Sequence, residues 1–521
     1  MIVITKEEMQ DAEKRAFASN LNQENIIEKA GVIIAQEAWV NTTASKNTKI
    51  IILVGPGNNG SDGLVAARFL SSWKATVTIL LISKRNDLNK YLKDEQKNIK
   101  CIEMIKNHEA RTITKKIKES ECIIDALYGI GWDINRKQKT DEYNLKKLLD
   151  KIQLHRDRQF ILCVDIPTGV DANTGQCIKN TLTADMTITF GAIKIGMTQQ
   201  PGSSKVGNII IEGLGIDHFI KERSSAHIIS KNDFHKNIIK RKSASNKGHF
   251  GKILVIAGSR IYPGAAILTC EAAAIAGAGI ITLASSKFVQ QINITKQPEL
   301  TLFDTGNSEY LDESIFPQLI RQVDNFNAIV IGPGISQNKR TVLLINKIIE
   351  FLKKNKHSIP LILDADGLNI LAKMENWPFK LSKNVILTPH PGEMARLLKK
   401  SITEIQSNRI KYASILAKKT EATVILKGPG TIIVSENNIM ISDVSVPALA
   451  TPGTGDILSG LIGGFLSQKL LPIDAACFGV YAHALAGQEV EKNIGNISSK
   501  ASDLFKYLPK TIKEIVYAKD K

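Results

Sequence analysis

Residues 450–466 read ATPGTGDILSGLIGGFL and decide the fold of the second half of the chain. The glycines come directly before Asp456 and a long apolar run, which predicts a buried helix that begins at this loop. We expect the backbone N–H groups of Gly453, Thr454 and Gly455 to converge there and to form an anion hole for a phosphoryl group. Asp456 beside that hole could accept the proton of an attacking hydroxyl. A helix cap alone would explain an aspartate here, but not the sequence GTGD.

The region upstream of this loop alternates short Ile/Val-rich strands with helical segments, which is typical of a parallel α/β domain. The strands that we expect cover residues 251–257, 279–284, 328–331, 361–364, 384–387 and 423–426. The first half of the chain has the same pattern. There we expect a helix over residues 7–17 and strands over residues 49–54, 75–82, 121–126, 159–165, 186–190 and 208–212. A polar segment, residues 217–247, separates the halves, so we place two domains at residues 1–225 and 226–521.

Composition limits the class of protein. The chain has 521 residues, of which 43% are hydrophobic and 23% charged, as in an ordinary soluble protein of more than one domain. No apolar run reaches the roughly 18 residues that span a bilayer, and the N-terminus lacks a secretion signal, so we expect a cytoplasmic protein without membrane contact. The net charge of +17 comes from lysines spread along the whole chain, so we expect no nucleic-acid partner. The six cysteines are scattered without zinc-site spacing, and we expect buried free thiols.

A second glycine-rich loop follows the first expected strand of the N-terminal half. Residues 55–70 read GPGNNGSDGLVAARFL, and such a strand-to-helix loop lets backbone N–H groups approach an anion. A tight turn capped by Ser61 or Asp62 would produce the same pattern. The expected strands nearby end in Asp125 and Asp165, and ligands of open α/β sheets gather at the carboxyl ends of strands. Oxygen atoms of Asn59, Asp125 and Thr168 could therefore hold a hard cation, which leaves Asp165 for acid/base work, although each aspartate could also be a turn former.

Four motifs of the N-terminal half, NNGSDG, DALYGIG, VDIPTGVDANTG and FGAIKIG, together resemble the NAD(P)HX epimerase domain of the YjeF family. The resemblance implies a Rossmann-like three-layer fold, a potassium ion on Asn59, Asp125 and Thr168, and proton transfers near Asp165 and Lys194. It also implies a binding site for a hydrated nicotinamide cofactor made by Asn58, Asn59, Gly60, Ser61, Asp62, Gly129, Ile130, Gly131, Trp132, Asp133, Ile134, Asn135 and Asp165. The chain departs from the family where NNGGDG becomes NNGSDG, DALLGTG becomes DALYGIG and IPSG becomes IPTG. Ser61 adds a side chain near the expected phosphate, which predicts a weaker epimerase.

Motifs of the C-terminal half, KGHFGKILVIAGS, IGPGI, DADGLNIL, LTPHPGEMARLL, LKGPGT and GTGD, resemble the ADP/ATP-dependent NAD(P)HX dehydratases. The resemblance implies a ribokinase-like α/β domain that phosphorylates the C6 hydroxyl of the hydrate, with Asp456 as the base, and then eliminates phosphate. It implies hydrate contacts from Ala265, Gly334, His390 and Asp456. It implies nucleotide contacts from Lys427, Gly428, Pro429, Gly430, Thr431, Gly453, Thr454 and Gly455. We expect ADP as the phosphoryl donor, NADHX and NADPHX as substrates, and a homo-oligomer; phosphoryl transfer also calls for Mg²⁺.

Several of these residues have plainer explanations. His390 could be a turn residue, Glu393 a first-turn helix acid, Lys427 a solvated loop charge and Ala265 part of the core. Asp364 and Asp366 could orient a metal ion or water, or simply form a turn. Two other functions also stay open. The C-terminal half could be a vitamin or sugar kinase that releases a phosphorylated product, and the N-terminal half could be a ligand sensor or scaffold.

Overall fold

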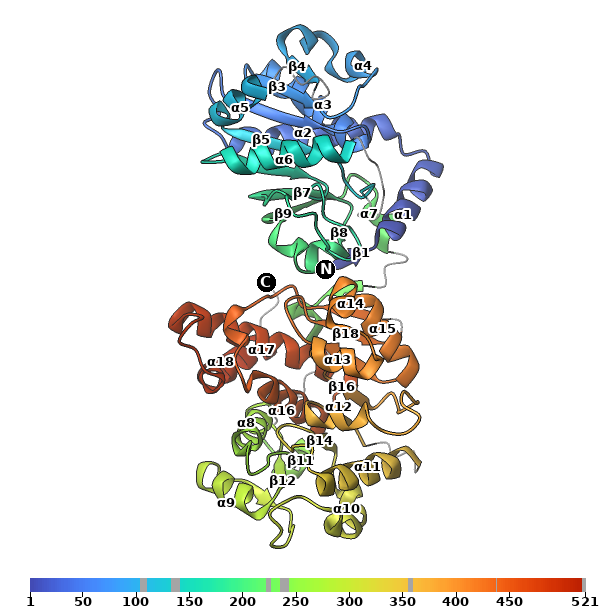
Figure 1. Cartoon of the computed structure of the whole chain (residues 1–521), viewed down its shortest axis with the longest axis vertical. Helices are drawn as coiled ribbons and strands as arrows, with labels where there is room; N and C mark the ends of the chain where they lie inside the picture. The colour runs from blue at the N-terminus through green and yellow to red at the C-terminus, as the bar shows by residue number, and fades with distance from the viewer. Residues whose placement is uncertain are drawn as a thin grey trace. The chain divides into compact units, whose positions relative to one another are not determined.

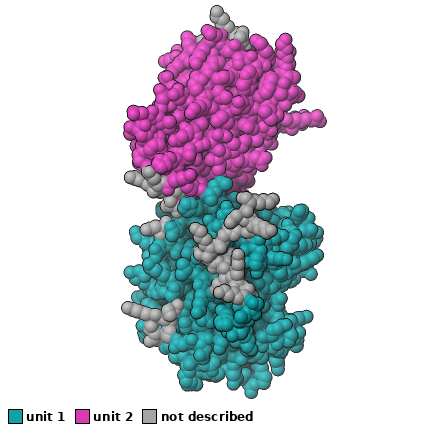
Figure 2. Space-filling view, turned by 180° about the vertical axis from the view of Figure 1, so that it is seen from behind, with its two compact units in different colours: residues 1, 227–521 teal, residues 2–226 magenta. Residues whose placement is uncertain are grey.

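The computed structural model describes residues 1–103, 110–132, 141–221, 226–234, 243–354, 359–436 and 438–517. The chain forms two compact units, which are Ile2–Ala226 and His227–Lys521 together with Met1 (Figures 1 and 2). None of the described helices is long and apolar enough to cross a membrane.

The N-terminal unit is built on a parallel sheet with the strand order β4-β3-β2-β5-β6-β7-β9. A separate short pair, β1 (Ile2–Ile4) and β8 (Ile193–Lys194), is also parallel. The main sheet contains β2 (Lys49–Val54), β3 (Thr76–Leu81), β4 (Lys100–Glu103), β5 (Cys122–Ala126), β6 (Phe160–Val164), β7 (Met186–Phe190) and β9 (Asn208–Glu212).

Helices cover both faces of this sheet, because the side chains of a strand alternate between its faces and those of β2 are apolar on both. Ile50 and Ile52 pack with α2 and α3, whereas Ile51 and Leu53 pack with α5 and α6. The unit is therefore a three-layer α/β sandwich. Its helices are α1 (Lys6–Ala18), α2 (Gln23–Val40), α3 (Asn58–Ser72), α4 (Leu88–Leu92), α5 (Ala110–Glu119), α6 (Asp141–His155) and α7 (Asp217–Lys221).

The C-terminal unit has a larger sheet, in which the strands follow the order β13-β12-β11-β14-β15-β16-β17-β18-β19. The strands are parallel from β13 to β17, and two antiparallel pairings add β18 and β19. Their bounds are β11 (Lys252–Ile256), β12 (Ile280–Ala284), β13 (Thr301–Leu302), β14 (Ala328–Ile331), β15 (Leu361–Leu363), β16 (Val385–Leu387), β17 (Thr423–Leu426), β18 (Ile432–Ser435) and β19 (Asn438–Ile441), and β10 (Ala226–Ile228) lies at the junction of the units.

Two apolar clusters sandwich this sheet. Ile253 and Val255 belong to the cluster with α8, α16 and α17, and Leu254 and Ile256 to the one with α10, α11 and α13. The helices are α8 (Pro263–Ile275), α9 (Lys287–Lys296), α10 (Phe316–Gln322), α11 (Lys339–Lys354), α12 (Asp366–Leu371), α13 (Pro391–Leu398), α14 (Ile402–Ser407), α15 (Arg409–Thr420), α16 (Thr454–Ser467), α17 (Pro472–Ile494) and α18 (Leu504–Val516).

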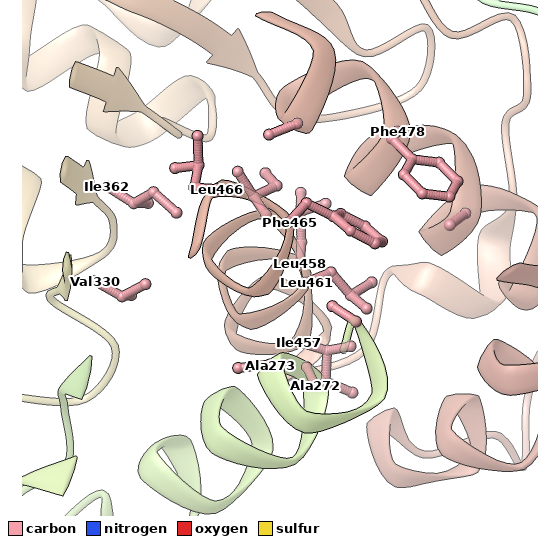
Figure 3. Close-up of a cluster of buried hydrophobic side chains, with 14 of the residues drawn as sticks. Ala272, Ala273, Val330, Ile362, Ile457, Leu458, Leu461, Phe465, Leu466 and Phe478 are labelled. Atoms are coloured by element: carbon pink, nitrogen blue, oxygen red, sulfur yellow. The ribbon is translucent and has the colours of Figure 1, made fainter. Parts of the chain in front are cut away.

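Helix α16 is buried on nearly all sides. Ile457, Leu461 and Phe465 point into the cluster of Figure 3. A Cβ atom on Gly460 would lie 2.2 Å from the carbonyl oxygen of Thr269 in α8, so this position admits only glycine. The close packing fixes the start of α16, which is where the GTGD loop lies.

These findings confirm the predicted α/β class and the predicted strands, whose ends differ from the observed ones by one residue at most. The sequence did not reveal β1, β4, β8, β10, β13, β18 and β19, which are two to four residues long. Length alone does not explain this, because β15 and β16 have three residues each and were predicted. Strands β18 and β19 pair antiparallel and therefore lie outside the strand–helix alternation on which the prediction depended.

Candidate active sites

The N-terminal site is a cavity of about 390 Å³ where β2 ends and α3 begins. Gly57 caps α3 without a side-chain hydrogen bond, so the first turn presents its backbone N–H groups. The cavity is lined by Met9, Gln10, Glu13, Phe17, Gln23, Ile26, Ile27, Ala30, Pro56, Gly57, Asn58, Asn59, Asp62, Leu127, Tyr128, Gly129, Ile130, Gly131, Asp165, Phe190, Leu214 and Ile216.

Asp165 and Lys194 form a buried ion pair beside this cavity. The Lys194 ammonium group is 0% exposed and donates to Asp165 Oδ1, and also to Thr189 Oγ1 and the Phe190 carbonyl, each at 2.9 Å. The second carboxylate oxygen, Oδ2, accepts a hydrogen bond from Ile130 N at 3.3 Å. Asp165 has a φ of +68°, which is unusual for a residue other than glycine and typical of functional sites. The pair can hold a proton at a defined position.

Asp125 and Thr168 lie together behind the cavity. Thr168 donates to Asp125 through its hydroxyl at 2.7 Å and its backbone N–H at 2.9 Å. Asp125 is 1% exposed, and burial raises its pKa. Among the described residues no Lys, Arg or His forms an ion pair with Asp125. Asn59 donates from Nδ2 to the Val164 carbonyl at 2.8 Å, while a Cβ on Gly129 would lie 2.8 Å from Asn59 Oδ1. This is an oxygen-rich environment with an unbalanced negative charge.

Ser61 does not project into the cavity as the sequence suggested. Its side chain is buried, and its Oγ accepts a hydrogen bond from Arg85 Nη2 at 2.8 Å. Arg85 also donates to the carbonyls of Gly55 and Gly57 and forms an ion pair with Asp87. Arg85 therefore braces the glycine-rich loop from behind. The sequence analysis missed it, because it lies 24 residues beyond Ser61 in an unremarkable polar segment.

The sequence analysis also missed Glu13, which lines the cavity from α1. Burial, and then the negative charge of Asp165, raise the pKa of Glu13, while Lys194 lowers it. Burial also raises the pKa of Asp62 well above its usual range, and Asp165 and Glu13 add to this effect. The only feature of the sequence that could have indicated Glu13 is an acid on the apolar side of the amphipathic helix α1.

Of the residues predicted to bind the N-terminal ligand, Asn58, Asn59, Asp62, Gly129, Ile130, Gly131 and Asp165 line the cavity. Gly60, Ser61 and Trp132 are not among the described lining residues. Trp132 instead packs on the ring of Tyr128, with ring centroids 5.2 Å apart. Asp133, Ile134 and Asn135 lie outside the described residues.

The C-terminal site lies at the start of α16. Gly453 is the N-cap and has a φ of +96°, a conformation that favours glycine. Thr454 donates from its hydroxyl to the carbonyls of Leu449 and Thr451 at 2.8 and 3.0 Å, which fixes the loop. A Cβ on Gly455 would lie 3.4 Å from Lys427 Nζ, so the helix start faces this ammonium group.

Lys427 is the centre of an acidic cluster. Its Nζ lies 2.7 Å from Asp364 Oδ1 and 4.0 Å from Glu393 Oε2. Burial alone would lower the pKa of Lys427, but Asp364, Glu393 and Asp456 raise it above its usual range. Asp364 is 1% exposed, and Lys427 keeps the pKa of its carboxyl low against the effect of burial. Hydroxyls of Thr388 and Ser459 also donate to Asp364, each at 2.7 Å.

Asp456 and Glu393 are the proton-holding members of this cluster. The pKa of Asp456 is raised to about 7, mainly by burial and also by the charges of Asp364 and Glu393, while Lys427 opposes them. Burial likewise raises the pKa of Glu393 to about 7. A carboxyl with this pKa can exchange a proton near neutral pH, which suits general base catalysis.

His390 caps α13, as the turn interpretation of the sequence suggested. Its Nδ1 accepts a hydrogen bond from Gly392 N at 3.0 Å, and its backbone N–H donates to Glu393 Oε2 at 2.8 Å. Glu393 is thus both a first-turn acid and a neighbour of Lys427. The Nε2 atom of His390 lies 3.4 Å from Glu393 Oε1, and burial lowers the pKa of the imidazole.

The KGPGT loop, residues 427–431, is held by a buried arginine. Arg409 is 5% exposed and its Nη2 donates to the carbonyls of Leu426, Lys427 and Gly430 at 3.1, 3.4 and 3.5 Å. Thr431 donates to the Gly428 carbonyl at 2.8 Å, and Pro429 lies between the two glycines. The sequence analysis missed Arg409, which comes from α15 before β17.

Ala265 and Gly334 lie in contact at another part of the same sheet edge. A Cβ on Gly334 would be 2.6 Å from the Ala265 Cβ, and Gly334 has a φ of +61°. Ala265 is only partly buried. It lies one helical turn before Leu268, whose side chain is next to Gly453 at the start of α16. Asp366, in contrast, is the first residue of α12, and its carboxyl group accepts hydrogen bonds from Asn369 and Gln337 at 3.1 Å each. This arrangement fits the second interpretation from the sequence, in which Asp366 forms a turn.

Comparisons with known proteins match both halves of the chain. A family model described as YjeF-related protein N-terminus matches residues 23–196, and one described as NAD(P)H-hydrate dehydratase matches residues 253–510. The bifunctional NAD(P)H-hydrate repair enzyme Nnr of Escherichia coli (strain K12) is 32% identical over 466 residues, 89% of this chain and 84% of that protein. The enzyme of the same name from Moorella thermoacetica is 29% identical over 528 residues, 99% of this chain and 97% of that protein.

A solved structure of an ADP/ATP-dependent NAD(P)H-hydrate dehydratase from Bacillus subtilis, co-crystallized with ATP/Mg²⁺, is 28% identical. It covers 55% of this chain and 98% of its own, with a TM-score of 0.47. On the similarity to the Escherichia coli enzyme and the two family models, the chain belongs to the family of bifunctional NAD(P)H-hydrate repair enzymes.

Proposed function

We propose that this chain repairs hydrated NADH and NADPH. Residues 1–225 interconvert the R and S epimers at C6 of the hydrated nicotinamide ring. Residues 226–521 dehydrate the S epimer and convert ADP to AMP and phosphate. The observation that carries the proposal is the cluster at the start of α16, where the carboxyl group of Asp456, with a pKa of about 7, can accept a proton close to Lys427 and Gly455.

Dehydration proceeds in two steps at this cluster. The Asp456 carboxylate accepts the proton of the C6 hydroxyl as its oxygen attacks the terminal phosphorus of ADP, and AMP leaves. The C6–O bond of the phosphate ester then breaks, a proton leaves C5, and the C5–C6 double bond of the dihydropyridine forms. Phosphate is a far better leaving group than hydroxide, so the reaction consumes a nucleotide to convert the hydroxyl into a phosphate ester.

The surrounding residues bind the two substrates. The N–H groups of Gly453 and Gly455 face the transferred phosphoryl group, and Lys427 neutralises its charge. The N–H group of Thr454, which the sequence also suggested, instead donates to the Thr451 carbonyl at 3.3 Å. Gly428, Pro429, Gly430 and Thr431 form the nucleotide loop that Arg409 holds in place. Ala265, Gly334 and His390 contact the hydrate.

Mg²⁺, brought with the nucleotide, would supply further positive charge for phosphoryl transfer. Asp364 fits poorly as its ligand, because Lys427, Thr388 and Ser459 already engage both carboxylate oxygens. The described residues contain no cluster of three His, Cys, Asp or Glu side chains that would bind a metal ion by itself. We therefore assign the ion mainly to the nucleotide and to water.

In the N-terminal domain, the helix start at Asn58–Asp62 and the Gly129–Gly131 loop bind the hydrate, and Asp165 and Lys194 handle protons. The same cavity is the proposed binding site because Asp165 of the buried ion pair lines it. A potassium ion on Asn59, Asp125 and Thr168 would balance the buried charge of Asp125, and the oxygen donors suit a hard cation. If so, K⁺ should raise the melting temperature of the N-terminal unit more than Na⁺ does, and Asp125→Asn should remove the difference.

One experiment tests the dehydratase proposal. The full chain is incubated with hydrated NADH, Mg²⁺ and either ADP or ATP, and absorbance at 340 nm and phosphate release are followed together. We expect equimolar NADH and phosphate, with a higher rate for ADP. A stable phosphorylated product without NADH would show a small-molecule kinase instead.

A second experiment tests the division of labour between the domains. Asp456→Asn should lower the dehydration rate by about 10²–10⁴-fold, as loss of a general base does, and leave epimerisation unchanged. An unchanged dehydration rate would place the base elsewhere. We also propose a homo-oligomer, and a mass of 57.2 kDa by light scattering, which is that of one chain, would contradict it.

A further inference from the structure

Three carboxyl groups line the cavity of the N-terminal unit, and the buried ammonium group of Lys194 lies behind one of them. Asp165 comes from the end of β6 and Asp62 from the first turn of α3, whereas Glu13 comes from α1. Met9, Glu13 and Phe17 are spaced four residues apart, so one side of α1 forms a wall of the cavity. Glu13 is the only acid on that wall among the described lining residues.

Lys194 neutralises only one of the three carboxyl groups. Its ammonium group bonds Asp165, Thr189 and Phe190, which uses all three of its donors. Within the described part of the chain, nothing donates a hydrogen bond to the carboxyl of Glu13 or of Asp62. Asp62 is 6% exposed and Glu13 is partly buried. Buried polar groups without a partner are costly, so ones that face a cavity are expected to meet a ligand there.

Inversion at C6 that proceeds by loss and return of water uses an acid/base group on each face of the ring. The carbon carries a hydroxyl group and the ring nitrogen, so the hydroxyl can leave as water from one face and water can return to the other. Departure requires a proton donor, and return requires a proton acceptor. A single residue such as Asp165 reaches one face only.

We infer that Glu13 is a second catalytic acid/base residue of the epimerase, opposite Asp165 across the bound ring. This inference rests on the proposed epimerase function. It assigns α1, which the sequence motifs do not include, to the active site.

The step balances as follows. The Glu13 carboxyl group gives its proton to the C6 hydroxyl, the C6–O bond breaks, and the nitrogen lone pair forms a C6=N1 double bond as water leaves. A water molecule on the other face attacks C6, the π electrons return to N1, and the Asp165 carboxylate takes the released proton. For the opposite epimer the two carboxyl groups exchange roles. The step starts from a protonated Glu13, whose pKa burial raises, and from the Asp165 carboxyl group that pairs with Lys194.

The test uses the full chain without nucleotide, because the dehydratase cannot act without a phosphoryl donor. One purified epimer of hydrated NADH is supplied, and the approach to the mixture of epimers is followed by chromatography. We expect Glu13→Gln, which keeps the size of the side chain, to lower kcat by about 10²–10⁴-fold with KM within a few-fold of wild type. Glu13→Asp should recover part of kcat. Glu7→Gln on the same helix, outside the cavity, is the matched control and should keep the wild-type rate.

The outcomes separate the inference from the function on which it rests. If the wild-type chain does not interconvert the epimers, the proposed epimerase function fails. If the wild type is active and Glu13→Gln keeps the wild-type kcat, with or without a change in KM, the inference about Glu13 is overturned and the proposed epimerase function stands. A structural role would lower the melting temperature of Glu13→Gln and would leave Glu13→Asp no better than Glu13→Gln, which would also overturn the inference.

Discussion

The rate of dehydration should depend on the ionisation of Asp456. A general base acts only when deprotonated, and burial, together with Asp364 and Glu393, brings the pKa of Asp456 to about 7. At pH 6 roughly a tenth of such a group is ionised, and at pH 8 roughly nine tenths. We therefore expect kcat/KM for the hydrate to rise by about tenfold between these pH values, whereas an aspartate with an ordinary pKa would give a flat profile over this range.

The same cluster predicts the direction in which the profile moves when a neighbour changes. The charge of Glu393 raises the pKa of Asp456, so removal of that charge should lower it. Glu393→Gln is a suitable change, because the amide oxygen can still accept the hydrogen bond from His390 N. The midpoint of the acid limb should move to lower pH by up to about one unit, which corresponds to about 1.4 kcal/mol.

The assay measures kcat/KM at saturating nucleotide and Mg²⁺ from pH 5.5 to 9, with epimerisation by the same samples as a control for stability. The bound nucleotide adds its own charge to the site, but it is present in both proteins and so cancels in the comparison. The reasoning would be refuted by an acid limb of the kcat/KM profile that lies below pH 5 in the wild type. It would also be refuted by a midpoint of that limb that moves to higher pH in Glu393→Gln.

Three further changes have definite expectations. Gly129→Ala should lower epimerisation by about 10²-fold without affecting dehydration, because its Cβ would lie 2.7 Å from Asp165 Oδ2 and displace the acid; equal losses in both activities would contradict this. Ser61→Gly should change epimerisation by less than about threefold and cost about 0.5–1.5 kcal/mol, because Arg85 keeps its bonds to two carbonyls; a large gain in rate would restore the idea that Ser61 obstructs the ligand. Lys427→Met should destabilise the C-terminal unit by about 3–5 kcal/mol at pH 7, since it leaves Asp364 as a buried unpaired charge. Urea denaturation followed by the fluorescence of each variant checks the two stabilities, and the Lys427→Met loss should shrink as pH falls and Asp364 becomes protonated.

The fold was largely predictable because its signal is local. A buried parallel strand shows as a run of Ile and Val, and β2 and β14 have their predicted bounds. The position of α16 was predicted from the glycines before Asp456 and the apolar run after it, and the structure shows that Gly460 within that run leaves no room for a Cβ against α8. The edge strands were missed because a strand such as β13, with only two residues, has no pattern of its own.

The sites were predictable only in part, because supporting residues carry no motif. Arg85 and Arg409 each bind several backbone carbonyls, and any arginine at the right place in space could do so. The misjudged direction of Ser61 has the same origin. The sequence shows that a hydroxyl replaces a hydrogen atom, but only the folded chain shows that Arg85 lies on the side of the loop away from the cavity.

The roles of the acids in the C-terminal site illustrate why position decides chemistry. Asp364, Glu393 and Asp456 all follow strands or begin helices, and the sequence favoured Asp456 as the base only through its place in GTGD. The folded chain supplies a further reason, because Lys427, 63 residues after Asp364, pairs with it directly. Asp364 then stays ionised and raises the pKa of the two carboxyls that the cation reaches less closely. The acid most firmly bound to the lysine is thereby excluded as the base, and its charge is what prepares Asp456 to accept a proton near neutral pH.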